Sequence, residues 1–120
     1  MLVGTEIKKY KNALAIFLSG ELDQYEAAII KSKMDVEIQE SEKKNVIIDL
    51  ADVTMMDSSG IGLIIGRYKL VCSLGKELVL SGGSESIRKV IALSGIEKIV
   101  PYYKTADEAS KSFREGSAKI

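Results

Sequence analysis

The first part of the chain carries the pattern of a β-hairpin. Residues 5–10 and 13–18 have the composition of strands, and Lys11-Asn12 between them suits a two-residue turn. Every position from 13 to 18 is apolar, which predicts a strand whose two faces are both covered. Gly20 is expected to end this strand.

The rest of the chain alternates helical and strand patterns. From Asp23 to about Ser41, apolar residues recur every three or four positions, which predicts an amphipathic helix. The later elements expected are a strand over 46–50, a helix over 59–73, a strand over 77–81, a helix over 84–94, a strand over 97–100 and a final helix that begins at Thr105. This order predicts a single α/β domain over residues 1–120, with a four- to five-stranded mixed sheet and about four helices.

Composition narrows the classes of function. The chain has 17 Lys and Arg against 17 Asp and Glu, so no net charge attracts nucleic acid or an anionic membrane surface. No apolar run approaches the ~20 residues that span a bilayer, and no secretory signal is visible, so a cytoplasmic location is expected. We therefore expect no direct nucleic-acid or membrane partner.

Two residue types that carry much of protein chemistry are scarce or missing. The chain has no histidine, which removes Ser–His and Cys–His nucleophile pairs and the commonest metal ligand. A single cysteine, Cys72, excludes an internal disulfide and a cysteine cluster. These absences predict a protein that is not an enzyme, with no catalytic residues, metal or cofactor.

The segment Met56–Gly62 joins a predicted buried strand to a predicted helix. Its two serines, Ser58 and Ser59, lie where a helix presents unpaired N–H groups and the positive end of its dipole. One interpretation is that a serine simply caps the helix. The other is that a serine accepts a phosphate, since Gly60 and Gly62 keep the first turn small enough for another protein to approach.

The helix that follows has two apolar stripes. The first is expected to face the sheet, with Cys72 as a packing residue, and consists of Ile61, Ile64, Ile65, Tyr68 and Cys72. The second contains Leu63, Gly66 and Leu70, on the side of Ser59. Either a neighbouring helix covers the second stripe, or it is an exposed docking patch.

Two other kinds of site are considered for this region. A dinucleotide site would need G-x-G-x-x-G, whereas Gly60, Gly62 and Gly66 give G-x-G-x-x-x-G. A phospho-acceptor receiver domain would use Asp49, Asp52 and Asp57, but it also needs an acidic pair after the first parallel strand, which is matched only in part. Solvated loop carboxylates are the preferred interpretation of Asp49 and Asp52.

Four segments together resemble a known family. They are Gly20-Glu21-Leu22-Asp23, Met56-Asp57-Ser58-Ser59-Gly60-Ile61-Gly62, Gly66-Arg67-Tyr68-Lys69 and Ser94-Gly95-Ile96. Their sequence and spacing are similar to those of the STAS-domain anti-sigma factor antagonists, and the G-R-Y-K continuation is similar to the sporulation branch that acts on the anti-sigma-F factor. Gln24-Tyr25 departs from that branch, which often has two histidines there.

The resemblance implies a regulatory function. It implies that an anti-sigma factor with serine kinase activity phosphorylates Ser58, that the unphosphorylated protein binds this factor and releases the sigma factor, and that a serine phosphatase reverses the modification. A STAS scaffold module of a stress-signalling complex and a small nucleotide-binding protein are the alternatives. The partner-binding surface expected comprises Asp23, Asp57, Ser58, Ser59, Gly60, Ile61, Gly62, Leu63, Gly66 and Arg67.

Overall fold

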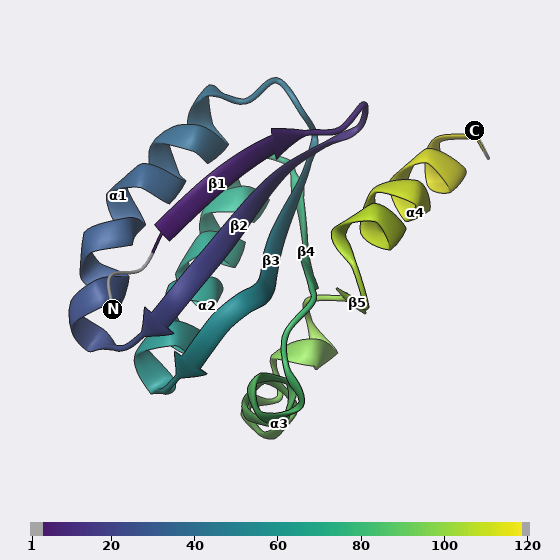
Figure 1. The fold of residues 1–120 in the computed structure, drawn as a ribbon. Helices are drawn as coiled ribbons and strands as arrows, with labels where there is room; N and C mark the ends of the chain where they lie inside the picture. The colour runs from purple at the N-terminus through teal and green to yellow at the C-terminus, as the bar shows by residue number, and fades with distance from the viewer. Residues whose placement is uncertain (1–3, 119–120) are drawn as a thin grey trace.

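The computed structural model describes residues 4–118, which form a mixed sheet with helices on both of its faces (Figure 1). The strands are β1 (Gly4–Lys9), β2 (Ala13–Leu22), β3 (Asn45–Met56), β4 (Glu77–Ser81) and β5 (Tyr102–Tyr103). The helices are α1 (Gln24–Glu40), α2 (Ser58–Ser73), α3 (Glu85–Ser94) and α4 (Ala106–Ala118), with a 3₁₀ turn at Ile96–Lys98.

The five strands of the described chain lie in the order β1-β2-β3-β4-β5. The β1–β2 pair is antiparallel, and every later pair is parallel. A hairpin followed by strands alternating with helices therefore gives the mixed α/β sheet that the sequence predicts. The fold class is confirmed.

The sheet separates two hydrophobic cores. The larger one lies under α1, α2 and α3, and strand residues such as Ile16 and Ile48 are fully buried in it. The smaller one lies under α4, where Ala109 packs over Ala15 and Ile47. The prediction that residues 13–18 form a strand covered on both faces is thus confirmed.

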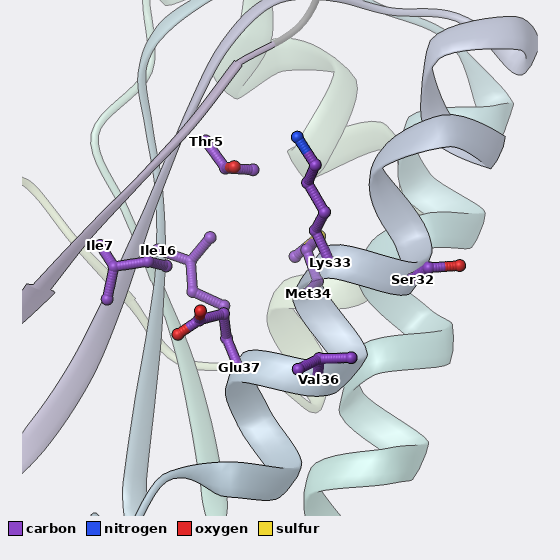
Figure 2. A pocket seen from close by; sticks show the side chains of 8 residues that line it. All are labelled: Thr5, Ile7, Ile16, Ser32, Lys33, Met34, Val36 and Glu37. Carbon is purple, nitrogen blue, oxygen red and sulfur yellow. The ribbon is translucent and has the colours of Figure 1, made fainter.

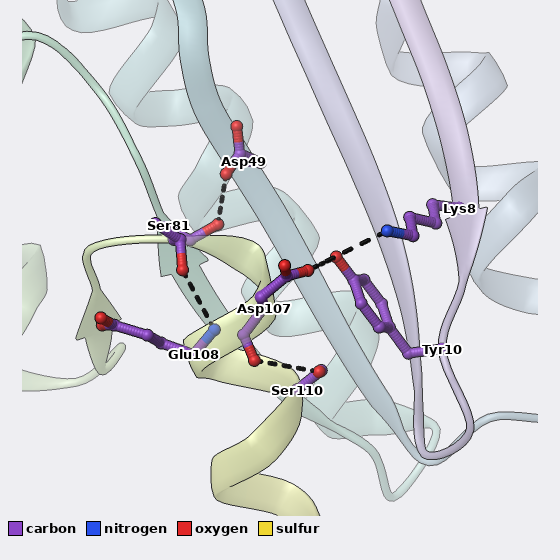
Figure 3. A network of polar contacts seen from close by, with 8 residues as sticks. Lys8, Tyr10, Asp49, Ser81, Asp107, Glu108 and Ser110 are labelled. Carbon is purple, nitrogen blue, oxygen red and sulfur yellow. Dashed lines mark hydrogen bonds and ion pairs between the residues drawn. The ribbon is translucent and has the colours of Figure 1, made fainter.

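Polar contacts stabilise the N-terminus of α4 and join it to the β1–β2 hairpin (Figure 3). The backbone N–H of Glu108 donates to Thr105 Oγ1 over 3.1 Å, so Thr105 caps the final helix, which the sequence predicts to begin there. The Tyr10 hydroxyl donates to Asp107 Oδ1 over 2.7 Å, and Lys8 Nζ lies 3.9 Å from the same oxygen. Burial and this hydrogen bond raise the pKa of Tyr10 to about 12.

Three predicted strand boundaries are wrong. Strand β2 continues through Gly20, which has a φ of 90° and lies beside a shift in the β2–β3 register, so the strand bends there instead of ending. Strand β3 extends to Met56 because the prolonged β2 keeps pairing with it. The strand expected at 97–100 is a 3₁₀ turn, since Ile96 and Val100 are both buried at a helical spacing of four, and the last strand is β5.

The structure also changes the interpretation of Asp49. Its side chain is buried, with 4% exposure, whereas Asp52 further along the strand is exposed. Asp49 accepts hydrogen bonds from Ser81 Oγ at 2.6 Å and from the Ala51 N–H at 2.9 Å (Figure 3). The expectation of a solvated loop carboxylate is therefore wrong for Asp49, which ties β3 to β4.

Candidate partner-binding site at the N-terminus of α2

The strands β2 and β3 end side by side, and each leads directly into a helix. Leu22 and Met56 are paired in register, so Asp23 and Asp57 follow them at the same edge of the sheet. Each aspartate caps the next helix: Asp23 accepts from the Glu26 N–H and Asp57 from the Ser59 N–H, both over 2.8 Å. The structure therefore brings together two segments that are more than thirty residues apart in the sequence.

Because Asp57 caps α2, neither serine has that role. Ser58 is the first residue of α2, its side chain is exposed, and its hydroxyl makes no hydrogen bond to any residue within 4–118. Ser59 is half-buried and donates its N–H to Asp57. The interpretation in which a serine caps the helix is wrong, and Ser58 presents a free hydroxyl to solvent.

The two glycines of the first turn have different surroundings. A Cβ on Gly60 would lie 2.5 Å from Met56 Cγ and 3.2 Å from the Leu22 carbonyl oxygen, so this glycine lets α2 pack directly on the two strand ends. A Cβ on Gly62 would meet no atom within 4 Å. Gly62 is exposed, and it leaves the surface next to Ser58 low and open.

Exposed apolar residues lie at the same edge. Tyr25 is 75% exposed and Ile29 52% exposed on the first turns of α1, where they line a shallow hollow with Gln24 and Ala28. Met55, at the end of β3, is 36% exposed. These residues are not among those that the sequence predicts for the partner surface, although Tyr25 and Ile29 are four positions apart and lie off the predicted core stripe of their helix.

The buried face of α2 differs from the prediction. The residues that are buried are Gly60, Leu63, Ile64, Arg67 and Val71. Leu63 has only 6% exposure, and Gly66 and Leu70 are half-buried, so the alternative in which a neighbouring helix covers the second stripe is confirmed and the stripe is not an exposed docking patch. Cys72, expected in the core, is exposed. The reason is that α1 packs against the flank of α2, which turns the buried arc toward Leu63 and Arg67.

Arg67 joins the two helices. Its Nε atom lies 2.8 Å from Asp35 Oδ1 on α1, and the two side chains are 6% and 26% exposed. An arginine held in this way inside the protein is not available to a partner, so its expected place on the binding surface is wrong. The sequence gives no sign of this ion pair, because it depends on which helix lies beside α2.

The geometry also bears on the dinucleotide site and the phospho-acceptor receiver site considered from the sequence. Gly60, the glycine that should approach a pyrophosphate, is buried against Met56 and Leu22. Among residues 4–118 no group of three or more His, Cys, Asp or Glu side chains could hold a metal ion, and Asp49 is engaged with Ser81. Across the same residues, no helix has the length and apolar character needed to cross a membrane.

Comparison with known proteins identifies the family to which this fold belongs. The STAS domain model matches residues 5–109. The chain belongs to the STAS domain family. The family resemblance that the sequence motifs indicate is therefore confirmed, and the five-stranded sheet of the described residues is a STAS fold.

The chain is similar to several named STAS proteins. It is 34% identical over 98 residues to an anti-sigma F factor antagonist of Paenibacillus polymyxa, covering 82% of this chain and 84% of that protein. It is 34% identical over 101 residues to an anti-sigma-B factor antagonist of Listeria monocytogenes, covering 83% and 88%.

Solved structures of one anti-sigma factor antagonist are similar as well. SpoIIAA in its unphosphorylated form matches with a TM-score of 0.77 and 26% identity, over 93% of this chain and 97% of that one. The Bacillus cell fate determinant SpoIIAA in its phosphorylated form matches with a TM-score of 0.68 and 26% identity, over 92% and 99%.

Proposed function

We propose that this STAS protein is an anti-sigma factor antagonist controlled by phosphorylation of Ser58. In its unphosphorylated form it binds an anti-sigma factor with serine kinase activity, in the cytoplasm, and so releases the sigma factor. The observation that carries this proposal is the exposed Ser58 hydroxyl, left free because Asp57 caps α2. The relatives named anti-sigma factor antagonists support it, as does the relative whose structure is of a phosphorylated form.

Phosphorylation at this position would act on binding more than on folding. A phosphoserine carries a charge of about −1.5 to −2 and three acceptor oxygens. At the N-terminus of α2 that charge is favourable to the helix by ~0.3–1 kcal/mol. Against a partner surface, next to Asp57, the same charge would be poorly compensated, and a loss of ~3–4 kcal/mol lowers affinity by two to three orders of magnitude.

We propose a partner surface formed by the exposed and half-buried residues around Ser58. Asp57, Ser58 and Gly62 are exposed, and Asp23, Ser59, Ile61 and Gly66 are half-buried around them. Gly60, Leu63 and Arg67 lie beneath the surface and act by holding α2 in place. Tyr25 and Met55 join the surface as apolar contacts.

The sporulation branch is the proposed pathway. Its motivation is the run Gly66-Arg67-Tyr68-Lys69 that follows the serine motif, together with the similarity to an anti-sigma F factor antagonist. We propose further that the whole chain of 120 residues works as one STAS domain, that it has no enzymatic activity of its own, and that a serine phosphatase restores the binding form.

The deciding experiment is phosphorylation by an anti-sigma factor serine kinase with ATP, followed by intact-mass analysis and peptide mapping. The wild-type chain should gain one acid-stable phosphate at Ser58. Ser58→Ala should gain none and still bind the kinase, and the matched control Ser59→Ala should be phosphorylated. A phosphate found on Ser59 alone, or one lost in acid as an acyl phosphate is, would contradict the proposal.

A further inference from the structure

A groove runs between the edge strand β1 and helix α1, away from the Ser58 site (Figure 2). Its volume is about 330 Å³, and its floor and walls include Ile16 of β2 and Met34 of α1. Two apolar side chains at its rim stay largely uncovered: Ile7 is 38% exposed and Val36 is 48% exposed. The groove therefore leaves apolar surface open beside a strand edge.

The backbone of β1 has hydrogen-bonding groups that point away from the sheet. The Tyr10 N–H donates to the Ala13 carbonyl across the hairpin turn. Because directions alternate along an antiparallel pair, Glu6 and Lys8 also bond toward β2, and the N–H and C=O groups of Thr5, Ile7 and Lys9 face outward. Within residues 4–118 no strand lies beyond β1 to receive them.

The outward edge of β1 is complementary to itself. If a second β1 lies antiparallel with its Ile7 opposite Ile7, then Glu6 lies directly opposite Lys8 of the second copy, and Lys8 opposite Glu6. These two pairs fall at positions without inter-strand hydrogen bonds, where side chains approach most closely. Opposite charges that face each other there stabilise strand pairing, whereas like charges oppose it.

Two charged side chains of α1 lie along the groove. Figure 2 shows the Lys33 side chain reaching toward Thr5 and the Glu37 carboxylate beside Ile16. A two-fold axis at Ile7 of the antiparallel strand pair places Ile7 against Ile7 of the second copy.

We propose that the β1 edge is a homodimer interface, in which a second copy of this chain pairs antiparallel to β1 about Ile7 and joins the two sheets. The outward backbone groups of Thr5, Ile7 and Lys9 supply the hydrogen bonds, and the exposed part of the Ile7 side chain is covered. A six-residue strand buries less than a standard interface, so the dimer forms in the micromolar range or above. None of the residues that line the groove belongs to the Ser58 site, so the dimer leaves that site open.

Sedimentation over a concentration series, with charge variants on β1, tests the proposal. The wild type should show a reversible monomer–dimer equilibrium. Glu6→Lys and Lys8→Glu should each weaken self-association by at least about tenfold, because each puts like charges opposite one another twice per dimer. An equimolar mixture of the two variants should recover the dimer, since each Lys then meets a Glu.

The control is Lys31→Glu, an exposed charge change on α1 outside the groove, which should leave the dimer unchanged. Amide hydrogen exchange at Thr5, Ile7 and Lys9 should slow with rising concentration in the wild type only. A wild type that stays monomeric up to about 1 mM overturns the proposal. So does a dimer that persists in both single variants, or a mixture that fails to recover it while both variants keep the wild-type far-UV spectrum.

Discussion

At the scale of single residues, the side chain that caps α2 determines what Ser58 is free to do. A helix start leaves N–H groups without partners, and a neighbouring Ser, Thr, Asn or Asp side chain can accept from them. Asp57 accepts from the Ser59 N–H here, and the exposed Ser58 hydroxyl makes no hydrogen bond to any described residue. A serine without a structural role, placed where a helix favours negative charge, suits a reversible phosphate.

The two glycines beside Ser58 should respond to substitution in opposite directions. Gly60→Ala places a Cβ against Met56 and the Leu22 backbone, and should lower the free energy of unfolding by ~1–3 kcal/mol. Gly62→Ala, into open space on the same helix, should raise it by ~0.5–1 kcal/mol. Urea denaturation of both variants measures this, and equal effects would show that Gly60 is not needed for packing.

Tyr10 should make stability depend on alkaline pH. Its folded-state pKa, about 12, lies above the value of 10 that it has when unfolded, so its contribution is fully present below pH 10 and is lost as the pH rises through about 12. Tyr10→Phe should remove this part of the decline. Denaturant unfolding between pH 9 and pH 12 measures it.

The matched control for Tyr10 is Tyr25→Phe, because Tyr25 is 75% exposed on α1 and its hydroxyl makes no hydrogen bond to a residue that the structure describes. Its alkaline profile should follow that of the wild type. If Tyr10→Phe keeps the wild-type decline as well, the Tyr10–Asp107 hydrogen bond does not contribute to holding α4 in place.

At the scale of elements, the position of α2 is set by its contact with α1 as much as by the sheet. Leu63 and Arg67 face this contact and are buried. The buried Arg67–Asp35 ion pair spans it with a 2.8 Å separation. Since Ser58 is the first residue of α2, this contact fixes how the serine is presented.

Arg67→Ala should loosen the two helices. Removing one partner of a buried ion pair leaves the other charge uncompensated, which typically costs ~3–5 kcal/mol. Asp35 is 26% exposed and can regain some water, so a loss of about 2–3 kcal/mol in the free energy of unfolding is expected. Thermal and urea unfolding measure it, with Lys69→Ala, an exposed position two residues along, as the control with little effect. A loss as small as that of the control would mean that the ion pair does not hold α2.

At the scale of the whole molecule, the sheet edge where β2 and β3 end presents Ser58 at the surface, above residues of the larger core. The residues that pack beneath it, Gly60 and Leu63, are already in place in the structure. Phosphorylation of Ser58 should therefore change backbone amide chemical shifts only in the 56–62 segment and the first turn of α1. Two-dimensional NMR of both forms measures this. Shift changes spread across β1 to β4 would show a conformational switch in place of local charge and steric exclusion.

Most of the local structure follows from short stretches of the sequence. Periodicity and side chains within a few residues predict the hairpin turn at Lys11-Asn12, the span of β4 and the start of the last helix at Thr105. The serine motif was also readable, because its residues are contiguous and its place after a strand is a local property.

The remaining features depend on contacts between elements that are distant in the sequence. The buried arc of α2, the exposure of Cys72 and the burial of Arg67 depend on α1, which ends at Glu40, well before α2 begins at Ser58. Asp49 is buried because β4 lies beside it and Ser81 supplies a hydroxyl. These outcomes are set by which elements become neighbours in space, and a periodic pattern shows that a face is apolar without showing what will cover it.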